Sequence, residues 1–394
     1  MSSRRRLVRM FPFSILREKT STVILMLVGP LFIMQACGGG GSSNGGNPGG
    51  PPPPAPTFTT IDAPGAGAMK GLGTTSLRIN GNGDIAGFFT NANNTSQGFL
   101  SPSGGGITPF NDPGAGMINS TGTSSQCIDS TETIVGSYVD AQLVSHGYFR
   151  TGVGTFGTID VPGASNTLAF GCDDAGAITG EYLDANQFAH GFVRANDGTF
   201  ATFDAPGAGQ GQFVGTIPMW INATGTIVGF FSDPNGVNHG FQRAVGGTIS
   251  TFDAPGAGKI AGSGTQAFSI NASGAIVGVV FTGSQNHSFL LSADGTFTVF
   301  DPPGTGGPAS SGHGSTAVGI NDGGMIVGSY TDSNLFLHGY LRGADGTFTT
   351  IDDPDAATGT PLSLGTVPLG INANGAIVGV FFGSAGERHG FVRE

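Results

Sequence analysis

Basic residues are scarce in this chain. Its 394 residues include 15 Lys and Arg against 26 Asp and Glu, which gives a net charge of −11. Six of the basic residues and one acidic residue fall within residues 1–36, so the remainder holds 9 basic and 25 acidic residues and a net charge of −16. Such a surface repels the phosphate backbones of DNA and RNA, which argues against nucleic acid as a partner.

The apolar run near the N-terminus is too short to cross a bilayer. It covers residues 23–34 and has 12 residues, whereas a spanning helix needs about 20. A basic segment precedes it and Gln35-Ala36-Cys37 follows, which is typical of an export signal over residues 1–36. The small residue before Cys37 and the Gly/Ser-rich tract after it resemble the lipobox of bacterial lipoproteins, which implies a lipid on Cys37. Cleavage without lipidation is the alternative.

Residues 37–56 show no apolar periodicity. Gly, Ser and Asn dominate the tract at first, and Pro51-Pro52-Pro53-Pro54 stands near its end. Such a tether is flexible and then stiffer, with a coil span of roughly 25 Å. We therefore expect an exported domain that meets the membrane only through the lipid anchor, or a periplasmic or extracellular protein without one.

Charged residues are also few, at 10%, while Gly and Pro number 72 and 23. The chain is nevertheless not of disordered type, because 30 Phe recur at regular intervals and provide a core. A motif best seen as Ile-Asn-Ala-Asn-Gly-Ala-Ile-Val-Gly, residues 371–379, recurs seven times. Its copies centre on Asn80, Asp129, Asp173, Asn222, Asn271, Asn321 and Asn372. A period near 48 residues marks a repeat architecture.

Two further motifs travel with the first. One is His-Gly-aromatic, as in His239-Gly240-Phe241, and the other reads Asp-Gly-Thr-Phe-Ala-Thr-Phe-Asp-Ala-Pro-Gly over residues 197–207. In the fourth repeat we expect strands at residues 217–221, 226–232, 239–243 and 248–253. Short Asn, Asp and Gly turns join these strands, and a longer link leads to the next repeat. Each repeat therefore predicts a four-stranded antiparallel unit.

Seven such units over residues 57–394 predict an all-β fold, a seven-bladed β-propeller of four-stranded antiparallel blades. A β-helix is the alternative, but it would need shorter coils and caps that the sequence does not offer. The domain begins with a fourth-strand motif, residues 57–62, and ends with a third-strand motif, residues 389–393. We expect these two segments to pair and close the ring, since pairing removes an open sheet edge.

The motif Ile-Asn-x-x-Gly-x-Ile-Val-Gly followed by His-Gly-Phe resembles the bacterial extracellular repeats of the HAF family, named for a His-Ala-Phe signature. Gly replaces the Ala in six copies, and Ser288 replaces it in the fifth. The resemblance covers residues 57–394 and implies an exported bacterial protein with a propeller-like fold. It implies no particular activity.

Six of the seven histidines occupy one position of the repeat, namely His146, His190, His239, His287, His338 and His389. A ring of metal ligands or catalytic bases is one interpretation. However, equivalent positions in different blades are spread around the disc, so they do not converge on one ion. We expect each imidazole to form a structural hydrogen bond to a turn or an Asp of its own blade.

Acidic residues also recur in the Gly-rich turns, for example Asp204 and Asp233. Carboxylates in such loops could hold calcium, but none has the alternating Asp spacing of a calcium loop, so we assign no cofactor. Hydrogen bonds from each Asp to its own turn are the alternative. No nucleophile motif occurs in a convincing context, and no catalytic residue is assigned.

Three residues depart from the repeat pattern. Trp220 is the only tryptophan, His313 is the only histidine outside the motif, and Phe336 places an aromatic side chain in what is elsewhere a polar turn. They point to a special surface on the third to sixth repeats. We interpret the chain as a monomeric extracytoplasmic binding or scaffolding module for a protein or glycan ligand. A secreted lyase or hydrolase acting on glycans is the alternative.

Cys127 and Cys172 are the cysteines that remain once Cys37 is assigned to the signal. They lie in the first strands of adjacent repeats, one residue out of register with each other. Because successive side chains point to opposite faces of a strand, the two use opposite faces of their blades. That parity permits a disulfide across the interface between the blades, which an oxidising compartment favours. It equally permits both thiols to point away from each other.

Overall fold

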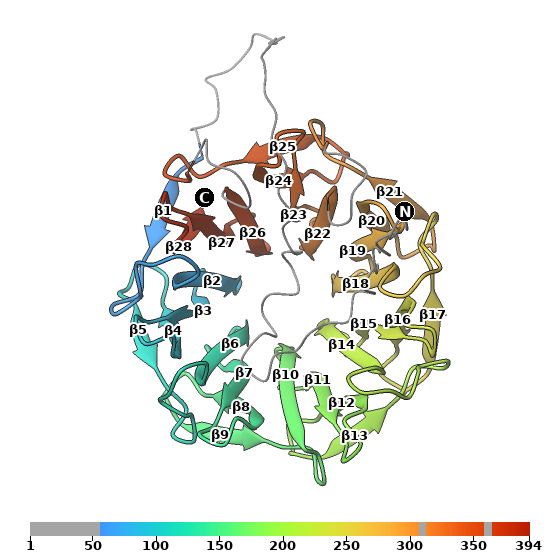
Figure 1. The fold of residues 1–394 in the computed structure, drawn as a ribbon, viewed down its shortest axis with the longest axis horizontal. Coiled ribbons are helices and arrows are strands. Elements are labelled where there is room, and N and C mark those ends of the chain that lie inside the picture. The colour runs from blue at the N-terminus through green and yellow to red at the C-terminus, as the bar shows by residue number, and fades with distance from the viewer. Residues whose placement is uncertain (1–55, 307–312, 358–364) are drawn as a thin grey trace, which may run out of the picture.

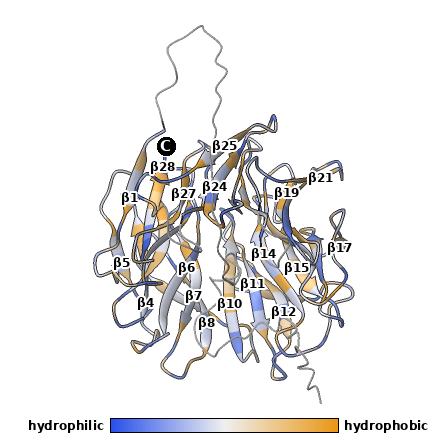
Figure 2. Cartoon of the chain, turned by 45° about the horizontal axis from the view of Figure 1, so that its top comes forward, coloured by the Kyte–Doolittle hydropathy of each residue, from blue (hydrophilic) through white to orange (hydrophobic). Residues whose placement is uncertain are grey.

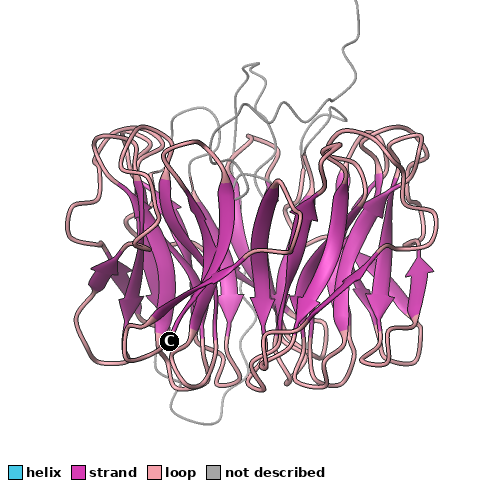
Figure 3. Cartoon of the chain, turned by 90° about the horizontal axis from the view of Figure 1, so that it is seen from below, coloured by secondary structure: helices cyan, strands magenta, loops and turns pink. Residues whose placement is uncertain are grey.

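The computed structural model describes residues 56–306, 313–357 and 365–394. The expected signal, Cys37 and the tether up to residue 55 lie outside this part. In the described residues all regular secondary structure is β, and no helix occurs (Figure 3). The same residues contain no helical segment that could span a membrane. The all-β fold class predicted from the sequence is thus confirmed for this part of the chain.

The strands form four-stranded antiparallel units arranged around a central axis, which is the architecture of a β-propeller (Figure 1). We call each unit a blade and name it by its innermost strand. The innermost strands are β2 (Gly73–Ile79), β6 (Gly122–Ile128), β10 (Asn166–Cys172), β14 (Thr216–Ile221), β18 (Gly264–Ile270), β22 (Ser315–Ile320) and β26 (Thr366–Ile371). The second strands are β3 (Ile85–Thr90), β7 (Ile134–Val139), β11 (Ile178–Leu183), β15 (Ile227–Ser232), β19 (Ile276–Phe281), β23 (Ile326–Thr331) and β27 (Ile377–Phe382).

Two outer strands complete each blade. The third strands are β4 (Ser96–Ser101), β8 (Ser145–Arg150), β12 (Ala189–Arg194), β16 (Asn238–Arg243), β20 (Asn286–Leu291), β24 (Leu337–Arg342) and β28 (Arg388–Arg393). The outermost strands are β1 (Phe58–Ile61), β5 (Thr108–Phe110), β9 (Phe156–Ile159), β13 (Phe200–Phe203), β17 (Ile249–Phe252), β21 (Phe297–Phe300) and β25 (Phe348–Ile351). The four-stranded antiparallel unit predicted for each repeat is confirmed.

Strand β1 is the first strand of the domain, but it belongs to the last blade, that of β26, β27 and β28. It pairs antiparallel with β28, in a register that sets Phe58 opposite Arg393 and Ile61 opposite Gly390. The backbone N–H groups of Thr57 and Glu394 extend the ladder, each donating to the carbonyl of the other residue. In Figure 1 the blue β1 lies beside the red β28. The segment expected at residues 57–62 therefore occupies the outer edge of the β26 blade.

The aromatic residue of each His-Gly-aromatic motif forms the centre of a blade interface. Phe99, Tyr148, Phe192, Phe241, Phe289, Tyr340 and Phe391 are all 0% exposed. At Gly98, Gly191 and Gly240 the middle residue lacks a side chain where an outer-strand Phe ring lies against it: a Cβ on Gly240 would lie 2.3 Å from the ring of Phe252. Fully burying one Phe stabilises the fold by about 1.5–3 kcal/mol, so these rings account for much of the packing between blades. Figure 2 shows such an apolar stretch within β28.

Adjacent blades also meet through a single backbone bridge at one rim. Asn238, at the start of β16, bridges Gly264, at the start of β18, in parallel orientation. Gly264 has φ +114°, and a Cβ there would lie 2.0 Å from the Asn238 carbonyl oxygen. Equivalent bridges join Ser96 to Gly122 and Arg388 to Gly73. These contacts explain why a Gly stands before so many of the innermost strands.

Candidate functional site

Each of the six motif histidines is paired with a carboxylate at the rim. The imidazole Nδ1 lies 2.7–2.9 Å from an Asp oxygen at the end of the outermost strand. The pairs are His146 with Asp160, His190 with Asp204, His239 with Asp253, His287 with Asp301, His338 with Asp352, and His389 with Asp62. The last pair joins residues 327 apart in sequence. The histidines thus tie third strands to outermost strands, as a structural role requires.

Five of these imidazoles have a second acidic neighbour and an aromatic platform. For His239, Nε2 lies 3.9 Å from Asp233 and the ring stacks on Phe231 with centroids 5.1 Å apart. Asp233 itself accepts hydrogen bonds from the backbone N–H groups of Asn235 and Val237, as expected for a turn Asp. Among the described residues, no three His, Cys, Asp or Glu side chains are placed to hold a metal ion.

The recurring Asn of the first motif forms a second, inner set of contacts between blades. Asn80, Asn222, Asn271, Asn321 and Asn372 each donate a side-chain Nδ2–H to the carbonyl of the equivalent residue in the next blade, at 2.9–3.1 Å. We call these five residues the asparagine belt. The bond from Asn372 to Asn80 joins the β26 blade to the β2 blade.

Asp129 and Asp173 interrupt the belt, because an ionised carboxylate has no hydrogen to donate. At the first interruption other bonds join the β6 and β10 blades. Cys127 and Cys172 form a disulfide there, with Cα atoms 5.9 Å apart. The backbone N–H of Ser130 also donates to the Asp174 carboxylate at 2.9 Å. This junction is therefore held covalently where the belt is missing.

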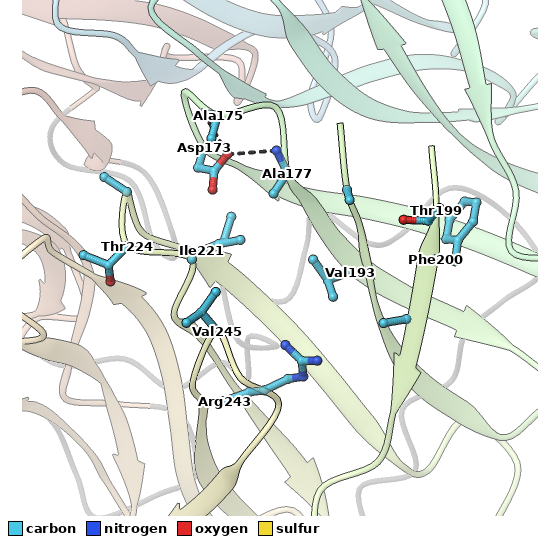
Figure 4. Close-up of a pocket in the computed structure, with 14 residues that line it drawn as sticks. Asp173, Ala175, Ala177, Val193, Thr199, Phe200, Ile221, Thr224, Arg243 and Val245 are labelled. Atoms are coloured by element: carbon cyan, nitrogen blue, oxygen red, sulfur yellow. Dashed lines mark hydrogen bonds between the residues drawn. The ribbon is translucent and has the colours of Figure 1, made fainter. Parts of the chain in front are cut away.

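At the second interruption, Asp173, the β10 and β14 blades leave an open groove of about 480 Å³ between them (Figure 4). The β10 blade contributes Asp173, Ala175, Ala177, Val193, Ala195, Thr199, Phe200 and Ala201, and the β14 blade contributes Ile221, Ala223, Thr224, Gly225, Arg243 and Val245. We call it the interblade groove. Its polar ends are Asp173 and Arg243, and apolar side chains lie between them.

Asp173 lies at one end of the interblade groove and is 8% exposed. Its Oδ1 accepts hydrogen bonds from the backbone N–H groups of Ala175 and Ala177. Burial raises the pKa of Asp173 above its usual range, although these backbone hydrogen bonds lower it in part. Figure 4 shows its other carboxylate oxygen directed into the groove.

Arg243 lies at the opposite end and, like Arg393 at the same repeat position, lacks a bond that three other described arginines of the repeat form. Arg150, Arg194 and Arg342 each donate from Nη1 to the carbonyl of the following residue, at 3.3–3.4 Å. Within the described residues Arg243 forms no such bond, and its buried Nε has no hydrogen-bond partner. The guanidinium lies 4.9 Å over the Phe203 ring and reaches into the groove (Figure 4). Burial lowers its pKa from the ordinary value.

None of the three departures expected to mark a special surface lines this groove. Trp220 is half-buried against two hydrophobic clusters, and the Arg78 guanidinium from the β2 blade lies 4.9 Å over its ring. His313 precedes β22, where its carbonyl accepts a hydrogen bond from the N–H of Asn286. Phe336 lies in the turn before β24, and its N–H donates to Asp332.

An arginine of the innermost strand β2 lies beside this tryptophan of the innermost strand β14. Arg78 donates from Nη1 to the carbonyls of Leu77 and Leu369, at 2.9 and 2.7 Å. Burial lowers the pKa of Arg78 to about 10. With both carbonyl bonds made and the Trp220 ring beneath it, the guanidinium serves packing between distant blades. Trp220 is therefore accounted for by this contact between innermost strands.

No protein-family model matches the sequence, and no curated protein matches it. Among solved structures, the chain is similar to a prolyl endopeptidase, with a TM-score of 0.54, 11% identity, and coverage of 81% of this chain and 50% of that one. It is also similar to TolB from Acinetobacter baumannii, with a TM-score of 0.46, 14% identity, and coverage of 68% and 62%. A lectin from Aleuria aurantia with a six-bladed β-propeller fold gives 0.43, 14%, and coverage of 70% and 94%.

At such identities the likeness concerns the fold alone. The chain spans 62% of the length of TolB and 50% of that of the prolyl endopeptidase.

Proposed function

We propose that this protein is an exported, lipid-anchored, seven-bladed β-propeller that binds a saccharide in the interblade groove. The export signal and the lipid on Cys37 rest on the N-terminal sequence pattern. Seven blades rest on the seven copies of the repeat. Closure of the ring is supported by the pairing of β1 with β28 and by the bond from Asn372 to Asn80.

A binding site is best supported by one observation: the repeat is broken on both sides of the same groove. Asp173 stands where the belt has Asn, and among the described arginines at this repeat position only Arg243 has a buried Nε without a hydrogen-bond partner. The histidines and their carboxylates recur around the ring and are engaged with one another. Departures from a repeat that face one cleft are the expected mark of a ligand site.

The lining suits a saccharide. A sugar ring presents hydroxyl groups at its edges and C–H groups on its faces. The groove offers a carboxylate and a guanidinium at its ends, with Val193, Ile221 and Val245 between them. It is open to solvent, as a site for one residue of a longer glycan must be. A glycosidase needs two carboxyl groups about 5–9.5 Å apart, and the groove lining contains one.

The test compares two substitutions at the same repeat position. Asp173→Asn keeps the acceptor for the N–H groups of Ala175 and Ala177 but removes the charge from the groove. Asp129→Asn makes the same change at the disulfide-linked junction, where no groove residue is altered. We expect a glycan array probed with the full chain to give binding that Asp173→Asn lowers at least tenfold and Asp129→Asn leaves unchanged. Equal binding by both variants, or no binding by the wild type, would overturn the proposal.

A further inference from the structure

The lining of the interblade groove bears on which class of saccharide it binds, an inference that rests on the proposed function. Arg243 is the only basic residue in the groove lining. Its guanidinium lies 4.9 Å over the Phe203 ring, a contact that holds it at the groove. An arginine fork that is positioned in this way matches the two oxygens of a carboxylate.

From these contacts we infer that the groove binds an acidic saccharide, one whose ring bears a carboxylate, such as a uronic acid. The carboxylate pairs with Arg243. The hydroxyl groups at the opposite edge of the ring donate to the free oxygen of Asp173, and the C–H face lies over Val193 and Ile221.

The two ends of the groove set the orientation of this ligand. Asp173 carries negative charge, so it repels a carboxylate and accepts hydrogen bonds from hydroxyl groups. Arg243 has no acceptor and therefore cannot take a hydroxyl proton. A sugar with its carboxylate toward Arg243 satisfies both ends. The reversed sugar sets its carboxylate against that of Asp173 and offers Arg243 only neutral hydroxyl acceptors.

The strong negative charge of the protein does not oppose this assignment. At physiological ionic strength the Debye length is about 8 Å, so distant acidic residues are largely screened. The guanidinium stands at contact distance in a partly dehydrated groove, where its attraction is screened much less. A basic surface would attract every polyanion, whereas a single arginine in an acidic surface selects by local fit.

The experiment is calorimetric titration of the full chain with tetragalacturonate and with neutral tetragalactose. We expect the acidic oligomer to bind at least tenfold more tightly. Arg243→Gln should remove that preference, and Arg243→Lys should restore part of it. Arg194→Gln is the matched control, because Arg194 occupies the same repeat position, bonds the Ala195 carbonyl and does not line the groove.

Equal affinity of the wild type for both oligomers would refute the acidic preference and leave the saccharide site standing. Absence of binding by either oligomer would refute the saccharide site as well. A preference that survives in Arg243→Gln, shown by its melting curve to be folded, would place the carboxylate elsewhere. Displacement of tetragalacturonate by millimolar inorganic phosphate would show a general anion site and overturn the assignment to a carboxylate.

Discussion

Asp173→Asn tests why the asparagine belt is interrupted at the interblade groove. An Asn at this position would carry the donor that the five belt residues use. Its Nδ2–H should reach the carbonyl of Asn222, as Asn222 reaches Asn271 at 2.9 Å. The turn should survive, because Asn222 accepts from its own turn N–H groups just as Asp173 does. We therefore expect the variant to be more stable than the wild type.

Two contributions determine how much the free energy of unfolding increases in Asp173→Asn. A buried amide-to-carbonyl hydrogen bond contributes about 0.5–1.5 kcal/mol net. Removing a buried carboxylate adds to this, because burial raises the pKa of Asp173 and so makes its ionised form unfavourable in the folded state. For a domain of this size, 1 kcal/mol corresponds to a shift in melting temperature of roughly 1.4 °C. Denaturant unfolding is the more sensitive measurement.

The pH dependence has a definite sign. The folded-state pKa of Asp173 lies above its unfolded value, so the wild type bears the cost of the ionised carboxylate above the folded pKa. That cost disappears as the pH falls toward the unfolded value of about 3.9. The advantage of Asp173→Asn should therefore be largest near pH 7 and smaller near pH 4. Asn271→Asp is the reverse control, and it should lose stability at pH 7. A wild type as stable as Asp173→Asn at pH 7, with Asn271→Asp destabilised, would refute this reasoning.

Three further predictions concern the other contacts between strands and blades. His338→Gln should lose more stability at pH 5.5 than at pH 8.5, because the hydrogen bond to Asp352 raises the pKa of His338. The stabilisation from this histidine is full below about pH 6.5 and is lost as the pH rises through its folded-state pKa. Urea titrations that show the same loss at both pH values would contradict this. Replacing Cys127 and Cys172 by Ser should cost up to about 4 kcal/mol for a closed loop of 45 residues, and alkylation with mass spectrometry should find both thiols blocked in the unreduced wild type. Deleting residues 57–62 should lower the unfolding midpoint of the whole domain, whereas deleting residues 38–56 should not; equal midpoints would argue against ring closure.

The blade could be predicted from the sequence because its determinants are local. Turns such as residues 222–225 set the first hairpin through an Asn acceptor and a Gly with φ +75°. Alternating apolar residues then fix which side chains are buried. In the fourth repeat the strand bounds differ from those expected by at most one residue at either end, for example Thr216–Ile221 against residues 217–221.

The sequence predicts that the motif histidines form structural hydrogen bonds, but not which Asp each one bonds. One imidazole per repeat implies a structural bond. The partner proves to be the Asp that directly follows the outermost strand, 14 residues later for His239 and at Asp62 for His389. The alternative of Asp bonding its own turn applies to Asp233 and its equivalents, and not to Asp253. The sequence places both Asp residues near the histidine, but only strand register decides which one meets Nδ1.

The asparagine belt and the groove were not foreseen. The sequence shows the seven central residues of the repeat and the change from Asn to Asp at positions 129 and 173. What the sequence does not show is that the Asn side chain crosses to the next blade. Arg243 is hidden for a similar reason, since Arg recurs at its position and only its buried Nε without a hydrogen-bond partner is distinctive.

The disulfide lies next to the interblade groove and restrains one of its ends. Cys172 directly precedes Asp173, so the bond to Cys127 fixes the backbone that carries the groove carboxylate. The β6–β10 junction can therefore stay closed while the β10–β14 junction lacks its belt bond. A carboxylate on a fixed backbone loses less freedom when a ligand binds, which increases affinity without adding a contact. Reduction of the disulfide should then weaken ligand binding even under conditions in which the domain remains folded.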